Sequence, residues 1–111
     1  MTEFQTIKGT HDLLPDKLIQ WRLIENTVHS IMEQYGYGEI KTPAFESTEL
    51  FVRGIGTDTD IVNKEMYSWT DQGENTLTLK PELTAPVVRA YLQHQLRNKN
   101  PLQRLWYFDS L

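Results

Sequence analysis

The sequence predicts an α+β fold, in which helices flank an antiparallel sheet. The first observation is a hairpin pattern: residues 65–70 and 76–80 are rich in β-forming residues and enclose a polar turn that contains Gly73. The second observation is a pair of amphipathic helical patterns, at about 16–35 and 81–96. A chain of 111 residues is long enough for one domain with a core and too short for two.

The first helix is predicted from about Asp16 to Tyr35, and Gly36 and Gly38 are expected to end it, because glycine accepts the left-handed conformation of a helix C-cap. This helix has two ways to bury its apolar stripe: against its own sheet, or against another subunit. The stripe consists of Leu18, Trp21, Ile24, Val28, Ile31, Met32 and Tyr35.

Shorter elements are expected between this helix and the hairpin. Residues 39–45 predict a short strand closed by Pro43, and the stretch that follows predicts a short helix with Ser47 or Thr48 as its cap. Residues 54–64 are expected to form a loop. After the second long helix and a polar linker, residues 103–111 have a continuous apolar centre, which is typical of a strand covered on both faces. Because no later strand follows to pair with it, we expect either a shortened chain or a partner chain that completes the sheet.

Composition excludes several classes of protein. The 39% of apolar residues and 23% of charged residues are typical of a globular domain. The absence of cysteine rules out disulfides and thiolate metal sites. A net charge of −4 argues against a surface built to neutralise nucleic-acid phosphates, so RNA contacts are expected mostly elsewhere. No membrane-spanning run and no signal peptide are recognisable, which indicates a cytoplasmic protein.

Candidate site residues lie in the stretch KPELTAPVVRA, residues 80–90. In one interpretation Thr84 is the N-cap of the second long helix and Glu82 is a carboxylate favoured by the helix dipole. In the other, the preceding strand delivers Glu82 and Thr84 to the rim of the sheet, where a carboxylate and a hydroxyl converge on a ligand ammonium group. The spacing alone leaves both interpretations open.

Other kinds of site receive no support. The histidines are scattered, and none has a second metal-ligating residue at a zinc-like spacing, so no metal site is assigned. The glycine-containing stretch at 53–60 fits neither the phosphate-binding loop nor the dinucleotide-binding pattern. No residues with the pattern of a serine or cysteine nucleophile occur, so no catalytic residue is assigned.

Several stretches in the same order resemble the N-terminal part of a class II aminoacyl-tRNA synthetase catalytic domain, and within that class the histidyl-tRNA synthetase family. They are KGTHDLLP, YGYGEIKTPAFESTELF, NKEMYSW, LTLKPELTAPVVRA and RLWYF. The resemblance covers nearly the whole chain. It implies that residues 1–111 hold motif 1 and the first strand of motif 2, and that the rest of motif 2, motif 3 and the anticodon-binding domain are absent.

The resemblance also implies roles for particular residues. Glu82 and Thr84 match the family residues that contact the amino group of histidine, whereas Lys80 and Leu83 stand where the family usually has arginine and glycine. Histidine, ATP with Mg²⁺ and tRNA(His) are the implied ligands of the whole enzyme. The motif 1 region implies a homodimer. The residues that handle ATP are not in this chain, so the 111 residues alone are expected to be inactive.

Two alternatives stay open at this point. One is the synthetase-like regulatory subunit of ATP phosphoribosyltransferase, which belongs to histidine biosynthesis and shares this architecture. Its matching stretch usually reads Arg-Ala-Asp-x-Thr-Pro, and KPELTAP is closer to the enzyme form. The other alternative is a different class II synthetase, such as the prolyl or threonyl enzyme.

Overall fold

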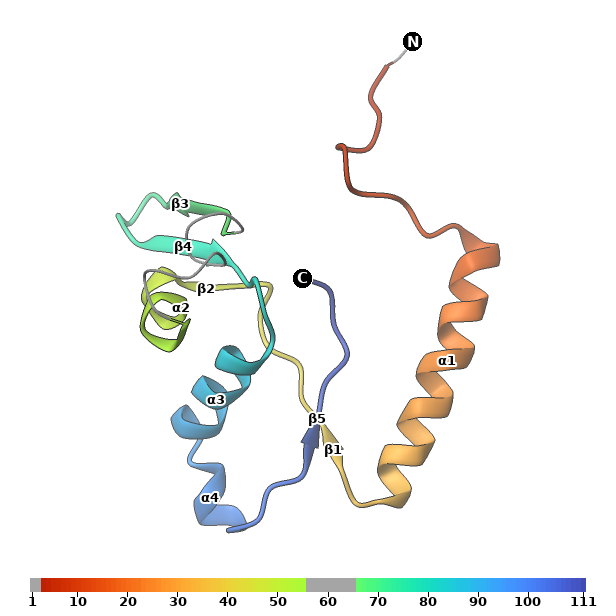
Figure 1. The fold of residues 1–111 in the computed structure, drawn as a ribbon, viewed down its shortest axis with the longest axis vertical. Helices are drawn as coiled ribbons and strands as arrows, with labels where there is room; N and C mark the ends of the chain where they lie inside the picture. Colours follow the sequence, from red (N-terminus) through yellow and green to blue (C-terminus); the bar gives the residue numbers. More distant parts are fainter. Residues whose placement is uncertain (1–2, 56–65) are drawn as a thin grey trace. The chain divides into compact units, whose positions relative to one another are not determined.

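The computed structural model describes residues 3–55 and 66–111. The chain divides into two compact units, Met1–Gly36 and Tyr37–Leu111. The first unit consists of an N-terminal segment and one helix, α1, and the second contains the described strands together with the other helices (Figure 1). Most of the loop expected at 54–64 lies outside the described residues.

Helix α1 spans Pro15–Gln34, which confirms the first predicted helix to within a residue at each end. Pro15 opens the helix, where its missing N–H is not needed. Gly36 adopts a left-handed conformation (φ +76°) just after the C-cap, as predicted from glycine's freedom. No α1 side chain is buried: Trp21 is 40% exposed and Ile24 is 51% exposed. Several residues of the apolar stripe of α1 therefore keep much of their surface exposed.

The antiparallel sheet of the second unit has three strands in the order β2 (Phe45–Ser47), β4 (Thr76–Leu79), β3 (Ser68–Thr70). Strands β3 and β4 form the predicted hairpin, paired with Trp69 opposite Leu77. Asp71 holds its turn, because Asp71 Oδ1 accepts the backbone N–H groups of Gly73 (2.9 Å) and Asn75 (2.8 Å). The antiparallel sheet with flanking helices confirms the predicted fold class.

A second, two-stranded sheet pairs β1 (Gly38–Glu39) in parallel with β5 (Leu105–Trp106). The strand expected at 39–45 is therefore wrong as one element: it is divided between β1 and β2. Pro43 explains the break, because proline donates no ladder hydrogen bond and restricts the residue before it. The strand expected at 103–111 is also much shorter, and Tyr107 and Phe108, which follow β5, are 36% and 40% exposed rather than covered on both faces.

Helix α2 (Thr48–Ile55) packs against strands β2 and β4 of the three-stranded sheet, and α3 (Thr84–Gln93) packs against α2 (Figure 1). The core between these elements is small, and Phe51 of α2 and Thr78 of β4 are both fully buried. Thr78 Oγ1 lies 2.7 Å from the hydroxyl oxygens of both Thr48 and Ser68. These hydrogen bonds satisfy a buried hydroxyl and attach the start of α2 to the centre of the sheet.

The second long helix is shorter than its apolar pattern predicted. Helix α3 ends at Gln93, and a separate short helix, α4, spans Leu96–Lys99 within the stretch expected to be a linker. Gln95, between the two helices, is left-handed (φ 51°), which ends α3 and redirects the chain. The apolar periodicity continues through this break and so does not reveal it.

Candidate substrate-binding site

The turn 80–83 connects the central strand of the antiparallel sheet to helix α3. Strand β4 ends at Leu79 and α3 begins at Thr84. The backbone N–H of Lys80 donates to the carbonyl oxygen of Ala44 (3.0 Å), so the turn starts from a fixed point beside β2. The sequence predicted that this strand brings Glu82 and Thr84 to the rim of the sheet. In the structure Glu82 lies in the turn just beyond the end of β4, and Thr84 is the first residue of α3.

Glu82 caps helix α3 with its carboxylate. Oε2 accepts the backbone N–H of Thr84 (2.7 Å) and Oε1 accepts that of Ala85 (2.9 Å). Two of the N–H groups left free at the start of a helix are thus satisfied by one side chain, next to the positive end of the helix dipole. A carboxylate has about four acceptor positions, so two remain for other donors. The carboxylate is held in one orientation and can still bind a cation.

Thr84 does not have the capping role considered from the sequence. It is the first residue of α3, the N-cap position belongs to Leu83, and no side-chain hydrogen bond caps the helix from that position. The Thr84 hydroxyl instead lies 3.4 Å from the hydroxyl oxygen of Tyr107, which follows β5. This distance exceeds the usual 2.5–3.0 Å of a hydroxyl pair, so the contact is weak and the Thr84 hydroxyl keeps its capacity for another partner.

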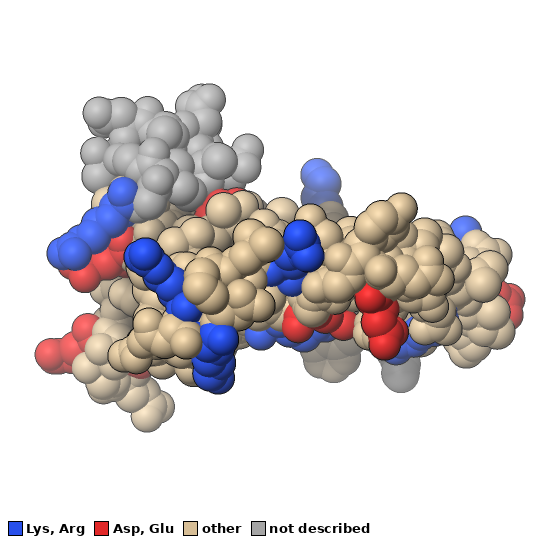
Figure 2. All heavy atoms as spheres, turned by 90° about the horizontal axis from the view of Figure 1, so that it is seen from below, with Lys and Arg blue, Asp and Glu red and all other residues tan. Residues whose placement is uncertain are grey.

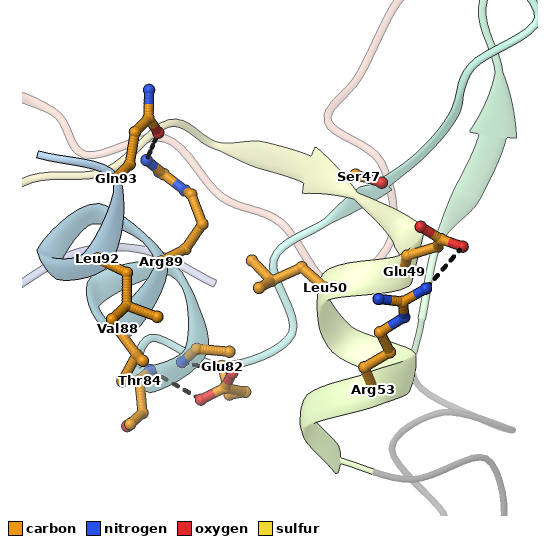
Figure 3. Close-up of a pocket in the computed structure, with 11 residues that line it drawn as sticks. Ser47, Glu49, Leu50, Arg53, Glu82, Thr84, Val88, Arg89, Leu92 and Gln93 are labelled. Carbon is orange, nitrogen blue, oxygen red and sulfur yellow. Dashed lines mark hydrogen bonds and ion pairs between the residues drawn. The ribbon is translucent and has the colours of Figure 1, made fainter.

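A cleft of about 1150 Å³ opens between α2 and α3, with Glu82 and Thr84 at one side (Figure 3). Its volume is slightly above the range of about 300–1,000 Å³ that is usual for pockets that bind small molecules. Leu50 points from α2 toward α3 across the cleft in Figure 3. The lining residues are Ser47, Glu49, Leu50, Arg53, Glu82, Thr84, Ala85, Val88, Arg89, Leu92 and Gln93.

The charged residues of the cleft differ in how firmly they are held. Arg89 donates to Glu46 Oε2 (2.8 Å) and to Gln93 Oε1 (2.8 Å), and Glu46 is largely buried, so this ion pair attaches α3 to β2. Arg53 and Glu49 of α2 form an exposed pair at 3.8 Å, which contributes little to stability. The α3 side of the cleft is therefore the better ordered of the two.

The described residues offer no metal site, since no group of three or more histidine, cysteine, aspartate or glutamate side chains is placed to hold an ion. Within the same residues, no helix has the length and apolar character to span a membrane. Acidic and basic side chains are interspersed with a larger area of uncharged residues on the face shown in Figure 2.

A comparison of the sequence with protein-family models identifies the family of the chain. The histidyl-tRNA synthetase model matches residues 9–111, which is nearly the whole chain. The chain belongs to the histidyl-tRNA synthetase family. This result confirms the resemblance drawn from the sequence motifs.

Curated relatives in the histidyl-tRNA synthetase family have similar sequences along the whole chain. The histidine–tRNA ligase of Chloroherpeton thalassium is 53% identical over 98% of this chain, and that of Staphylococcus epidermidis is 52% identical over 90%. These alignments cover 26% and 24% of the two relatives. The chain thus spans about a quarter of the length of the curated relatives that it matches.

Solved structures of the family share the fold. Apo histidyl-tRNA synthetase from S. aureus is 42% identical, with a TM-score of 0.78, and the match covers 95% of this chain and 24% of that one. A Bacillus halodurans protein described as an ATP phosphoribosyltransferase regulatory subunit/histidyl-tRNA synthetase is 28% identical, with a TM-score of 0.77, over 96% of this chain and 27% of that one. The greater identity to the ligases agrees with the enzyme-like form of residues 80–86.

Sequence reasoning missed the surroundings of Lys80, where the histidyl-tRNA synthetase motif usually has arginine. Lys80 is buried, and Nζ donates to Asp109 Oδ2 at 2.7 Å. This hydrogen bond from Lys80, together with the backbone N–H of Ser110, holds the pKa of the Asp109 carboxyl below its ordinary value. Lys80 and Asp109 are 29 residues apart, so no local pattern could have paired them.

Proposed function

We propose that this chain forms the N-terminal part of the catalytic domain of a histidine–tRNA ligase. Such an enzyme activates histidine with ATP to histidyl-adenylate and transfers the histidyl group to tRNA(His). The observation that carries the proposal is the 53% identity to a curated histidine–tRNA ligase over 98% of the chain. The regulatory-subunit alternative has less support, since the solved structure whose description includes that activity is 28% identical.

Within this enzyme, Glu82 and Thr84 are proposed to bind the amino group of histidine. An ammonium has three donors and no acceptor. Two hydrogen bonds to the start of α3 orient the Glu82 carboxylate, which retains free acceptor positions. Thr84, two residues further along the chain, is the first residue of α3 and supplies a hydroxyl. Together they offer a charged and a neutral acceptor at one side of the cleft.

Binding the ammonium end of histidine would direct its carboxylate end toward ATP. In the activation step a carboxylate oxygen forms a bond to the α-phosphorus as the bond to pyrophosphate breaks. Since the carboxylate is already ionised, no general base is needed, and catalysis consists of positioning and charge neutralisation on the phosphates. Mg²⁺ would supply part of that neutralisation when bound, and among the described residues no group of three or more histidine, cysteine, aspartate or glutamate side chains is placed to hold it.

We further propose a homodimer in which the apolar stripe of α1 lies at the subunit interface. No residue of α1 is buried in the described chain, and a two-fold interface would cover the stripe on both copies. The cytoplasmic location expected from the sequence stays a prediction.

The test of the proposed function is amino-acid-dependent pyrophosphate exchange by the complete enzyme that carries this segment. Exchange should depend on histidine, and proline or threonine should support little of it. Exchange that follows either of those amino acids instead would favour another class II synthetase. A folded protein that binds histidine without any exchange would favour the regulatory subunit.

A further inference from the structure

Lys80 is a buried cation whose ammonium group contacts Thr42 and Asp109. It is 4% exposed, and Nζ lies 2.7 Å from Asp109 Oδ2, 3.3 Å from the carbonyl oxygen of Thr42 and 3.4 Å from Thr42 Oγ1. The Asp109 contact is short, whereas both Thr42 distances exceed the usual range of about 2.7–3.2 Å for an N–H···O bond, so the Asp109 carboxylate is the principal partner of the ammonium group. A buried charge is tolerated only when it is paired and hydrogen-bonded in this way, so the side chain is held in one position.

The Lys80 contacts join three segments of the unit Tyr37–Leu111. Lys80 directly follows β4 of the antiparallel sheet, Thr42 lies in the connection between β1 and β2, and Asp109 lies beyond β5 of the parallel pair. The ion pair therefore ties the end of the central strand of one sheet to the chain that continues from the other.

Both ends of the ion pair are close to the proposed histidine-binding residues. Glu82 is two residues beyond Lys80, and Tyr107, whose hydroxyl lies 3.4 Å from that of Thr84, is two residues before Asp109. Two residues of chain span at most about 7 Å. A displacement of Lys80 or Asp109 would therefore be passed on to Glu82 or Tyr107 almost undiminished. The ion pair thus lies two residues from Glu82 on one side, and on the other two residues from Tyr107, whose hydroxyl neighbours that of Thr84.

We propose that the Lys80–Asp109 ion pair is a positioning device, which sets where Glu82 and Thr84 stand and thereby the affinity for the amino group of histidine. This inference rests on the proposed function. The ion pair also neutralises the Lys80 ammonium. Without Asp109 this charge would be unpaired two residues from Glu82, whose carboxylate is proposed to bind the ammonium group of histidine. Loss of Asp109 would therefore both loosen the turn and leave the buried Lys80 ammonium without its charged partner.

The experiment measures KM for histidine and KM for ATP by pyrophosphate exchange in the complete enzyme, with thermal melting alongside. Lys80→Met and Asp109→Asn should each raise KM for histidine about five- to tenfold, because small misplacements of binding groups are costly. KM for ATP should change less than about twofold. Lys80→Arg keeps the charge and restores the residue usual at this position in the family, so it should raise KM for histidine less than Lys80→Met does. The double variant should be no worse than the worse single one, since both act on one interaction.

A lower melting temperature with unchanged KM for histidine would overturn the inference, because the ion pair would then be merely structural. Equal increases in KM for both substrates, or additive effects in the double variant, would overturn it as well. If Lys80→Met fails to fold, Asp109→Asn decides alone, since Asp109 is the more exposed partner and asparagine keeps its shape. Glu82→Gln is the reference: if it too leaves histidine activation intact, the proposed site itself is wrong, whereas loss in Glu82→Gln alone contradicts only the positioning role.

Discussion

Glu82 Oε2 accepts the backbone N–H of Thr84 at 2.7 Å, so the two residues proposed to bind the amino group of histidine are bonded to each other. The same carboxylate also accepts the N–H of Ala85, the next residue of α3. The helix-capping and ligand-binding interpretations of Glu82 are thus compatible, because one bonded carboxylate serves the helix and keeps acceptor positions for an ammonium. For variants of Glu82, protein stability and enzyme activity must therefore be measured separately.

Glu82→Gln in the complete enzyme is expected to lower kcat/KM for histidine by at least about tenfold. A hydrogen bond to a charged group contributes about 1.5–3 kcal/mol, and the glutamine amide would also turn donors toward the ammonium. The capping role adds a stability loss of about 0.5–2 kcal/mol, because one backbone N–H of α3 would lose its acceptor. Pyrophosphate exchange and thermal melting measure the two effects.

Ala90→Gly is the control for the helix. Ala90 is a buried residue in the interior of α3, and glycine there costs about 1 kcal/mol of helix stability without altering the charge at Glu82. This variant should melt earlier and still activate histidine normally. If Glu82→Gln and Ala90→Gly lose activity equally, Glu82 acts only as a helix cap.

Thr84→Val is expected to lower kcat/KM for histidine by about two- to tenfold, less than Glu82→Gln, because it deletes a neutral partner. The stability loss should be small, since the Thr84 hydroxyl makes no capping hydrogen bond. Tyr107→Phe removes the hydroxyl 3.4 Å away and leaves Thr84 in place. Equal losses in the two variants would show that Thr84 acts through Tyr107 instead of on the substrate.

Local patterns in the sequence predicted much of the fold. Periodicity placed α1, alternation around a polar turn placed the β3–β4 hairpin, and the family motifs identified Glu82 and Thr84 as the site residues to test. Each of these signals lies within a short stretch of chain, where side-chain spacing follows directly from helix or strand geometry.

Features that depend on distant residues or on single backbone conformations could not be predicted. The left-handed Gln95 interrupts an apolar pattern that continues past it. The Lys80–Asp109 pair joins residues far apart in the chain. Glu82, and not the Thr84 that cap preferences favour, satisfies the first N–H groups of α3, because a longer side chain one position before the N-cap reaches forward to them.

The 111-residue chain alone is expected to give no histidine-dependent pyrophosphate exchange above the buffer rate. Its described residues place Glu82 and Thr84, but Arg89 is engaged with Glu46, and the positive groups that would neutralise the phosphates are assigned to other parts of the enzyme. Clear turnover by the purified chain would contradict this expectation. A phosphate-binding residue would then have to be sought among four arginines of the chain, Arg53, Arg89, Arg97 and Arg104.

The hairpin turn should lose stability in acid. The hydrogen bonds that Asp71 accepts, first from the backbone of Asn75, hold its pKa below the ordinary 3.8. A carboxyl with a depressed pKa stabilises the fold at pH values above its unfolded pKa, and the contribution disappears as pH falls through the folded value. Asp71→Asn should thus raise amide hydrogen exchange in residues 68–79 at pH 7, with the difference from the parent narrowing below about pH 3.8. Asp12→Asn, outside the hairpin, should leave amide hydrogen exchange in residues 68–79 the same as in the parent. If the difference between Asp71→Asn and the parent persists in acid, the ionised carboxylate is not its cause.

Helix α1 is expected to form a two-fold interface in the complete enzyme, because no residue of the helix is buried and Ile24 of its apolar stripe is 51% exposed. Ile24→Glu would place an unpaired charge on each side of such an interface. Since burying an ion without a partner costs several kcal/mol, the dimer dissociation constant should rise by at least about 100-fold. Asn26→Glu is the matched control: two residues along, it lies about 200° around the helix, so the same charge should face away from the interface. Sedimentation equilibrium across protein concentrations measures both variants. If both dimerise as tightly as the parent, or if the parent is a monomer at high micromolar concentration, the stripe has another partner and the proposed interface is wrong.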